Sequence, residues 1–327
     1  MTTLVTGATG FLGSAIAREL LRDGRKIKLL ARDNADLRNI DGLDTELVKG
    51  DLRDRDSLKS AMKGCSTLYH AAAYYSLWDR NKKLIYEINV QGTRNILETA
   101  LELGLERVVY TSTVGCIGLS DNRTPTNEDY PMDPITLSND YKISKFQAEK
   151  IALEMYGRGL PIVIVNPSTP IGPRDIKPTP TGKIILDFLN GNMPAYLDTG
   201  LNLIDVADCA RGHILAEKKG RLGERYILGN KNMSLKEILL ALEKITGIKA
   251  PSIKIPYWVA YAAGWFCESV SNLVTQEPPA VPLAGVKMAK YFMYFDSSKA
   301  IRELGLPQTP VEKALSQSVQ WFQKNRC

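Results

Sequence analysis

The chain has 327 residues, of which 44% are hydrophobic and 24% are charged, and its formal net charge is +6. This is the composition of a globular protein, which excludes disorder, collagen and coiled coil as the main state. The length predicts one large unit or two fused units. The chain contains no long run of lysine and arginine, so we expect no nucleic-acid partner, although a weak attraction to anionic cofactors or anionic membrane surfaces is allowed.

Residues that mark disulfides, metal sites and membrane segments are sparse. The five cysteines are far apart and form no C-x-x-C pair: Cys65, Cys116, Cys209, Cys267 and Cys327. They predict free thiols in a reducing cytoplasm, and the chain's two histidines predict no metal site. The first residues indicate a strand, not a signal peptide. The apolar window 257–274 is short and contains Glu268, so we expect no transmembrane segment.

The first half of the sequence alternates short apolar runs with amphipathic helical patterns. The predicted strands are residues 4–6, 26–31, 46–49, 66–70, 107–111 and 161–165, and the predicted helices are 13–23, 56–62, 84–103 and 141–156. Strands separated by helices at this spacing indicate βαβ units. We therefore predict an α/β fold with a Rossmann-type, doubly wound parallel sheet.

The second half lacks this regular alternation. Residues 166–182 contain five prolines and predict a loop. The elements expected after it are 184–189, 206–217, 225–228, 235–246, a helix over 257–274 and a last helix near 311–323. We predict a dinucleotide-binding domain over residues 1–165. Residues 166–327 would form a smaller, mainly substrate-binding part, with some segments returning to the sheet.

A glycine-rich turn joins the first strand to the first helix. It reads Gly7-Ala8-Thr9-Gly10-Phe11-Leu12-Gly13, with G-x-x-G-x-x-G spacing, and lacks the Gly-Lys-Ser/Thr of a P-loop. Glycines allow the backbone to approach a pyrophosphate closely, and the helix N-terminus offers free N–H groups. The position of this turn predicts dinucleotide binding by Gly7, Thr9, Gly10, Phe11, Leu12 and Gly13.

The end of the second strand bears on the choice between NAD and NADP. An acidic residue there binds the ribose 2′-hydroxyl of NAD, whereas an arginine can pair with the 2′-phosphate of NADP. Arg32 precedes Asp33, and Arg38 is nearby. We therefore predict NADP, with Arg32 as the phosphate-binding residue. NAD, bound by Asp33, is the alternative.

Two further segments are candidates for cofactor contacts. Asp51 follows the third strand, next to Leu52, and its carboxylate either meets the adenine amino group or only forms a turn. The small residues Ala71, Ala72 and Ala73 follow the fourth strand. They either let the cofactor lie against the backbone or simply pack tightly.

A tyrosine, a lysine and two hydroxyls are candidates for proton transfer. Tyr141 and Lys145 are four residues apart on a predicted helix and therefore share a face. A nearby ammonium lowers the pKa of a phenol, which would make Tyr141 an acid/base group. Ser112 and Thr113 end the fifth strand, where a hydroxyl can bind a substrate oxygen. Alternatively, the pair is incidental and the hydroxyls reflect strand propensity.

Together, the glycine turn, residues 111–113 and the Tyr141/Lys145 pair resemble the extended short-chain dehydrogenase/reductase superfamily, of the NAD-dependent epimerase/dehydratase type. Segments 203–208 and 296–305 also match. The resemblance implies that Tyr141 transfers the proton, that Lys145 holds the nicotinamide ribose, and that Thr113 polarises the substrate oxygen, with Ser112 as the near alternative. It further implies that Asn89 positions the lysine through water.

Segments 74–78, 166–175, 177–182 and 194–200 resemble more closely the hopanoid-associated sugar epimerase group, which is similar to dihydroflavonol reductases and 3β-hydroxysteroid dehydrogenases. The resemblance implies hydride transfer at a secondary alcohol or ketone carbon, with a sugar epimerase linked to hopanoid biosynthesis as the main hypothesis. An NADPH-dependent ketone reductase is the alternative. A non-catalytic NADP-binding regulator is disfavoured, because the tyrosine–lysine pair is retained.

The same segments supply Pro167 as a cofactor contact and six substrate candidates: Tyr74, Trp78, Ser168, Arg174, Lys177 and Tyr196. The two cations either bind a phosphate or carboxylate or belong to a solvated loop. The aromatic residues, with the aromatic helix 257–274, favour a polycyclic or lipid substrate and peripheral membrane contact. Alternatively, that helix only packs on the second domain. The resemblance also implies a homodimer formed through helices 84–103 and 141–156.

Overall fold

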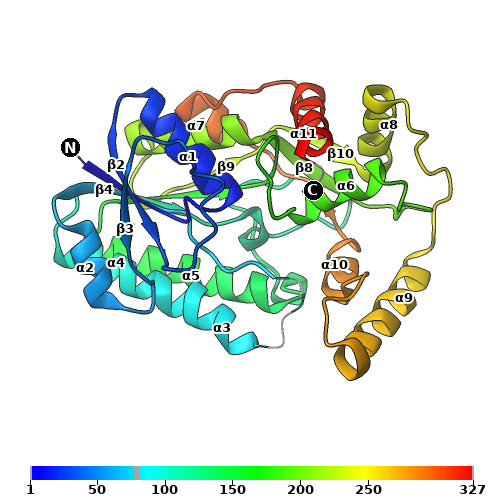
Figure 1. Cartoon of the computed structure of the whole chain (residues 1–327), viewed down its shortest axis with the longest axis horizontal. Helices are drawn as coiled ribbons and strands as arrows, with labels where there is room; N and C mark the ends of the chain where they lie inside the picture. Colours follow the sequence, from blue (N-terminus) through cyan, green and yellow to red (C-terminus); the bar gives the residue numbers. More distant parts are fainter. Residues whose placement is uncertain (1, 77, 79–80, 326–327) are drawn as a thin grey trace.

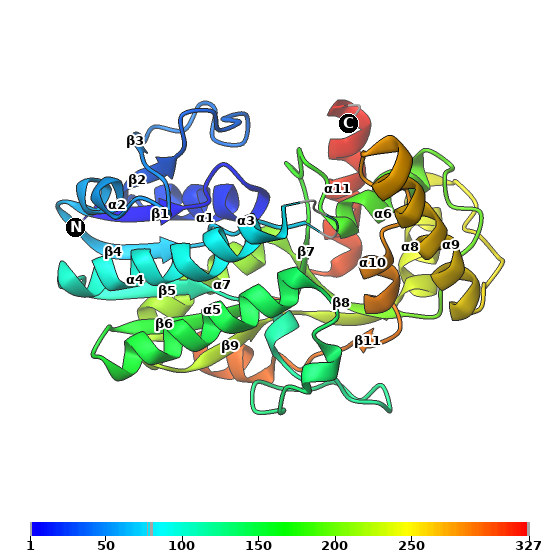
Figure 2. The ribbon, with the colours of Figure 1, turned by 90° about the horizontal axis from the view of Figure 1, so that it is seen from below.

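The computed structural model describes residues 2–76, 78 and 81–325, and its larger part is built on a seven-stranded sheet. The strand order is β3-β2-β1-β4-β5-β6-β9, and every neighbouring pair is parallel (Figure 1 shows the whole chain, and Figure 2 labels all seven strands). The strands are β1 (Thr2–Thr6), β2 (Lys26–Ala31), β3 (Glu46–Lys49), β4 (Cys65–His70), β5 (Arg107–Thr111), β6 (Ile162–Pro167) and β9 (Arg225–Leu228). The order reverses between β1 and β4, and such a switch point opens a crevice at the carboxyl ends of the strands.

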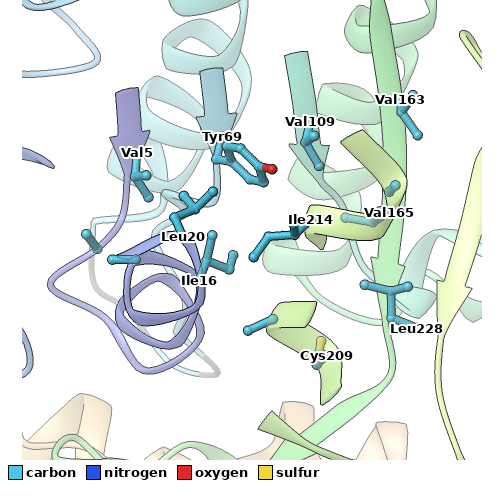
Figure 3. Packing of buried hydrophobic residues seen from close by; sticks show 14 of the residues in the cluster. Val5, Ile16, Leu20, Tyr69, Val109, Val163, Val165, Cys209, Ile214 and Leu228 are labelled. Atoms are coloured by element: carbon cyan, nitrogen blue, oxygen red, sulfur yellow. The ribbon is translucent and has the colours of Figure 1, made fainter. Parts of the chain in front are cut away.

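Helices cover both faces of this sheet. On one face α1 (Phe11–Arg22) and α7 (Val206–Lys219) bury a core that Figure 3 shows closely. On the other face lie α2 (Arg55–Met62), α4 (Gly92–Glu102) and α5 (Asp140–Gly157). Apolar side chains pointing to both sides of each central strand explain why these strands are continuous apolar runs. The predicted doubly wound parallel sheet is confirmed.

The predicted helix 84–103 is a helix of changing pitch. It starts as α3 (Lys82–Tyr86), passes through the π-helical turn η1 (Glu87–Gln91) and continues as α4. A π-helical turn adds a residue to one turn of a helix and is frequent at functional sites. This turn contains the buried Asn89. The sequence pattern gave no sign of it.

The smaller part is built on a second, four-stranded sheet. The strands β10 (Lys231–Ser234), β8 (Gly200–Asp205) and β11 (Phe292–Met293) follow one another, and β7 (Thr169–Ile171) also pairs with β8. The helices α6 (Pro180–Leu189), α8 (Leu235–Thr246) and α11 (Val311–Asn325) pack together beside it. The short helical segments are η2 (Val114–Cys116), η3 (Pro134–Thr136) and η5 (Ala300–Leu304).

Two further helices project from the end of the smaller part, α9 (Tyr257–Val270) and α10 (Leu283–Met288) (Figure 2). The predicted helix 257–274 keeps α-helical geometry only to Val270 and then becomes the π-helical turn η4 (Ser271–Thr275). Within the described residues, every helix is too short or too polar to cross a membrane.

Several expectations for the second half were wrong. Residues 166–182 are not one loop, because β6 extends to Pro167, β7 follows, and α6 begins at Pro180. The strands β7, β8, β10 and β11 and the helix α10 were not predicted. Their short runs of two to six residues carry no clear alternation, and neighbouring segments determine their pairing. The elements α7 and β9 pack with the first sheet.

Four cysteines, Cys65, Cys116, Cys209 and Cys267, are free thiols, and Cys327 lies outside the described residues. Across residues 2–76, 78 and 81–325, no group of three or more His, Cys, Asp or Glu side chains is placed to hold a metal ion.

Candidate active site

A cavity of about 960 Å³ lies at the carboxyl ends of the first sheet, between this sheet and the smaller part. It brings together most residues that the sequence indicated for cofactor binding and catalysis. Those on its wall are Gly7, Thr9, Gly10, Phe11, Leu12, Gly13, Arg32, Asp51, Leu52, Ala71, Ala72, Ala73, Tyr74, Ser112, Thr113, Tyr141, Lys145, Pro167, Ser168 and Lys177. The volume is ample for a small-molecule site.

The glycine turn packs so closely that side chains would not fit. Gly7 has a φ of +75°, which favours glycine, and a Cβ there would lie 2.6 Å from the backbone nitrogen of Ala72. A Cβ on Gly13 would overlap the carbonyl oxygen of Gly7. The turn is closed by a hydrogen bond of 2.9 Å from the N–H of Gly10 to that same oxygen. The first helix is thereby held against the end of β1.

The N-terminus of α1 is open toward the cavity. Its N-cap is Gly10, which offers no side chain, and its first turn contains no acidic residue. The first N–H groups of a helix have no intrahelical partner and carry the positive end of the helix dipole. Phe11, Leu12 and Gly13 line the cavity at this point. The turn therefore fits the pyrophosphate of a dinucleotide such as NAD or NADP.

The two candidates at the end of β2 differ in position. Arg32 lies on the cavity wall, whereas Asp33 does not and pairs with Lys49 at 2.8 Å. Arg38 is engaged with Asp36 through two hydrogen bonds, of 2.7 and 3.0 Å, and holds the pKa of that carboxyl down to about 2. Arg32, directly after β2, is therefore a cavity-lining cation, and its role in binding a nucleotide stays a prediction.

Asp51 makes the turn contacts that were its alternative role. Its carboxylate accepts hydrogen bonds from the Arg53 backbone N–H at 2.9 Å and from the Arg53 guanidinium at 2.7 and 3.0 Å. These bonds lower the pKa of Asp51. Asp51 and Leu52 still line the cavity, so they shape its wall even though the carboxylate is already paired.

The two cations of the loop after β7 differ in position, since Lys177 lines the cavity and Arg174 does not. Arg174 is exposed, has a φ of +74° and lies outside the cavity wall. Lys177 lies on the wall, but its Nζ is 3.9 Å from a carboxylate oxygen of Asp36, next to the end of β2. This position places Lys177 at the cofactor end of the cavity. We call the Lys177–Asp36 contact the loop latch.

Tyr141 and Lys145 both lie in the cavity, but their expected electrostatic coupling is absent from this structure. The ring of Tyr141 packs against Tyr75, with ring centroids 4.3 Å apart, and burial raises the pKa of Tyr141. The Lys145 ammonium instead donates to the Tyr110 hydroxyl at 3.2 Å and to the Thr111 carbonyl at 2.8 Å. Burial lowers the pKa of Lys145 to about 8. The expected lowering of the tyrosine pKa by the lysine was wrong for this state.

The structure separates the two hydroxyls at the end of β5. Ser112 donates its hydroxyl proton to the buried carboxylate of Glu149, which also accepts from Asn166 at 2.7 Å and Arg225 at 3.2 Å. Thr113, which lines the cavity, accepts from the Gly115 N–H at 3.1 Å, and within the part of the chain that the structure describes its own O–H has no acceptor. Ser112 therefore belongs to a buried network, and Thr113 is the hydroxyl available to a substrate.

Asn89 contacts neither the cavity nor Lys145. Its side-chain amide pairs with both backbone groups of Tyr74, at 2.7 and 2.9 Å, and donates to Ser144 at 3.0 Å. It thereby ties the segment after β4 to α5, one residue from Lys145. The expected role of Asn89 in positioning the lysine stays a prediction, and the observed bonds show that it positions these two elements directly.

The remaining substrate candidates divide between the cavity and other places. Tyr74 and Ser168 line it, and the Ser168 hydroxyl is buried without a hydrogen-bond partner among the described residues. Trp78 lies in a smaller depression beside α10, where its indole N–H donates to Asn272 at 3.0 Å. Tyr196 is buried in the core of the smaller part, so its assignment to the substrate site was wrong. Leu77 of the same motif lies outside the described residues.

Several wall residues were missed. The apolar ones come from α6, β8, α8 and the segment 285–293: Ile184, Leu201, Leu235, Met288, Ala289 and Met293. The elements that carry Ile184 and Leu235 were predicted without a role at the site, whereas the short segments that carry Leu201, Met288, Ala289 and Met293 were not predicted. Lys142, which is 4% exposed and has a pKa lowered to about 8 by burial, also lines the cavity. Its place beside Tyr141 was the signal that could have revealed it.

Comparison with known proteins also indicates an enzyme that binds a nicotinamide dinucleotide. The NAD dependent epimerase/dehydratase family matches residues 3–229. A Synechocystis protein named "Putative dihydroflavonol 4-reductase" is 48% identical over 325 residues, covering 98% of this chain and 94% of that protein. "Sterol demethylase protein B" of Methylococcus capsulatus is 34% identical over 325 residues, covering 99% of each. The crystal structure of gox2253 superposes with a TM-score of 0.88 at 43% identity and covers 99% of this chain and 98% of its own.

The glycine turn, the switch-point cavity and these relatives lead to one conclusion. The chain belongs to the NAD dependent epimerase/dehydratase family and is an NAD(P)-dependent oxidoreductase.

Proposed function

We propose that this enzyme is an NADPH-dependent ketone reductase whose substrate is an apolar, polycyclic compound. The observation that carries the proposal is the lining of the cavity away from the cofactor turn. Leu201, Leu235, Met288 and Met293 form this wall, and among the described wall residues Arg32, at the cofactor end, is the one arginine. The diphosphate of a sugar nucleotide calls for cations, and besides Arg32 the described wall offers the lysines Lys142, Lys145 and Lys177, of which Lys145 is bonded to β5 and Lys177 lies beside Asp36. The sugar epimerase hypothesis therefore has less support.

The names of the relatives support the same choice. A dihydroflavonol and a sterol are both fused- or linked-ring compounds of low polarity, and their names belong to relatives that cover almost this whole chain. The reductase alternative drawn from the sequence thus has more support than the hopanoid-associated sugar epimerase. The apolar wall is what such ring systems would contact.

The preference for NADPH is supported by the end of β2. Arg32 faces the cavity, whereas Asp33 is occupied by Lys49 outside it. An arginine can pair with the 2′-phosphate of NADP, and a carboxylate at the same place would favour the 2′-hydroxyl of NAD. The arrangement favours the phosphorylated cofactor.

Three side chains can carry the chemistry at the substrate oxygen. The buried Tyr141 phenol keeps its proton at neutral pH, because its pKa is raised, and can donate it to a ketone oxygen. The free O–H of Thr113 can bind the same oxygen as negative charge develops on it. Lys145 uses two of its N–H groups on β5, which leaves one for a cofactor hydroxyl. Reduced nicotinamide, when bound, supplies the hydride.

The test is to incubate the purified enzyme with NADPH and two substrate panels, steroidal and flavonoid ketones in one and nucleotide sugars in the other. We expect loss of reduced-nicotinamide absorbance with a ring ketone and no change in the sugars. Tyr141→Phe should lower kcat by about 10²–10⁴-fold. Tyr156→Phe, the same change near the far end of α5, is the matched control and should leave kcat unchanged. Epimerisation of a nucleotide sugar without net cofactor consumption would contradict the proposal.

A further inference from the structure

The helix α9 exposes a large apolar surface that the fold leaves uncovered. Trp258 is 72% exposed, Trp265 60%, Phe266 64% and, in the adjoining turn, Leu273 82%. We define the aromatic face as Trp258, Tyr261, Trp265, Phe266, Leu273 and Val274. Only Ala260 and Gly264 of α9 are buried. An exposed apolar patch of contiguous large side chains is rare on a protein without a partner.

The aromatic face is a property of one side of the helix. Trp258, Tyr261 and Trp265 recur at spacings of three and four residues, which places them on one face. The opposite face packs on α10, where a Cβ on Gly264 would lie 3.2 Å from Val286. The single charged residue of α9, Glu268, turns inward, because its carboxylate accepts the N–H of Leu283 at 3.1 Å. The outer side is thus free of charge.

Basic residues lie close to this face in the sequence, one of which, Lys254, is 3.6 Å from a carboxylate oxygen of Asp198. Over residues 249–290 the chain has four lysines, Lys249, Lys254, Lys287 and Lys290, against the two glutamates Glu268 and Glu277. Three of the lysines, at 249, 254 and 290, are exposed, and Lys254 comes three residues before α9. Tryptophan and tyrosine with neighbouring lysines form the side-chain set that binds the headgroup region of a bilayer.

The same helix pair is also a wall of the cavity. Gly285 and Met288 of α10, with Ala289, line the cavity, and α10 is the helix on which α9 packs. Figure 1 shows α9 and α10 together at the lower right edge of the molecule, and in both ribbon views they lie far from β3 (Figures 1 and 2). The aromatic face is therefore one helix layer away from the apolar part of the site.

We propose that the aromatic face docks the enzyme on the surface of an anionic phospholipid bilayer, from which an apolar substrate reaches the cavity past α10. The 14 residues of α9 span about 21 Å, less than the roughly 30 Å of a hydrocarbon core, so α9 lies in the interface and does not cross it. A second copy of the chain fits less well, because a twofold contact would oppose the same lysines. The docking itself rests on the surface, and only the delivery of substrate rests on the proposed function.

The test measures binding to vesicles made of equal amounts of phosphatidylcholine and phosphatidylglycerol. We expect the wild-type protein to sediment with them, less so at high salt and less so with pure phosphatidylcholine. The double variant Trp265→Glu/Phe266→Glu should bind at least about tenfold more weakly, since it removes two large apolar groups and adds two negative charges. Leu47→Glu, on exposed β3 at the opposite end, is the matched control and should bind like wild type.

Wild-type protein that stays in solution with these vesicles, or a double variant that binds as well as wild type, would overturn the docking proposal. A wild-type dimer that the double variant converts to a monomer, with no vesicle binding, would assign the face to a second copy and also overturn it. NADPH binding by each variant verifies folding. Reduction of a detergent-dissolved ketone is measured separately, so failure of the proposed function is distinguishable from failure of docking.

Discussion

Replacement of Gly13 by alanine tests how closely the first helix approaches the glycine turn. The added Cβ would overlap the carbonyl oxygen of Gly7 and lie 2.9 Å from the nitrogen of Ala8. Both neighbours are backbone atoms that are anchored to β1, so they cannot rotate away as a side chain would. The N-terminus of α1 must therefore move outward, and its free N–H groups must move with it.

The size of the effect follows from these contacts. Overpacking at a rigid site costs about 1–3 kcal/mol, and the better helix propensity of alanine returns up to about 1 kcal/mol. We expect Gly13→Ala to lower the free energy of unfolding by about 1–2 kcal/mol. Losing one hydrogen bond to a charged phosphate costs about 1.5–3 kcal/mol, which raises the Kd for NADPH by roughly 10- to 150-fold.

The assay combines thermal unfolding with a fluorescence titration of NADPH. The matched control is Gly157→Ala at the end of α5, where a Cβ would meet nothing within 4 Å and φ is not positive. We expect this control to be neutral or slightly stabilising and to bind NADPH like wild type. Wild-type Tm and Kd in Gly13→Ala would refute the reasoning, because the close approach would then carry no energetic weight.

Three further outcomes are expected. Arg32→Ala should raise the Kd for NADPH about 10- to 100-fold and leave that for NADH unchanged, as measured by titration; equal losses would contradict the role of the arginine. Thr113→Ala should lower kcat about 10²–10³-fold, whereas Ser112→Ala should mainly lower Tm. If steady-state kinetics show the larger loss of kcat in Ser112→Ala, then Ser112 and not Thr113 binds the substrate oxygen. His70 and His213 are fully buried, with pKa values lowered from 6.5 to about 3 and about 4. Below pH 6.5 the unfolded chain therefore binds more protons than the folded protein, and the free energy of unfolding should fall as the pH drops from 6.5 toward 4. His213→Gln should make this fall with pH shallower, as measured by denaturant titrations at several pH values. An unchanged dependence on pH would contradict the role of His213.

The larger sheet could be predicted from the sequence because its signals are local. Each strand is a short apolar run followed by an amphipathic helix, and the glycine turn lies at the one place where that alternation begins. The smaller sheet could not be predicted in this way. Its strand β11 has two residues and pairs with Gly200 and Leu201, some ninety positions earlier in the chain, so only the folded arrangement defines it.

The candidate site, like the fold, could be predicted from the sequence only in part. Motif spacing predicted that Tyr141, Lys145 and Thr113 lie together, because Thr113 comes just after the end of β5 and the other two lie at the start of α5. Motif spacing could not predict the hydrogen-bond partners of these side chains. The Ser112 hydroxyl donates to Glu149, 37 residues later in the chain, and the Lys145 ammonium donates to the Thr111 carbonyl of β5. Tyr196 was misassigned, since an aromatic residue in a matching segment can point into a core as readily as into a cavity.

The loop latch has a kinetic consequence. It joins Lys177, from the loop after β7, to Asp36, beyond the end of β2, and both residues line the cavity. Because the Lys177 side chain is 79% exposed, the contact contributes little to stability and is screened by salt. If this contact must open before a nucleotide leaves, added salt should speed cofactor exchange slightly. If exchange limits turnover, the enzyme would then run faster, not slower, as ionic strength rises.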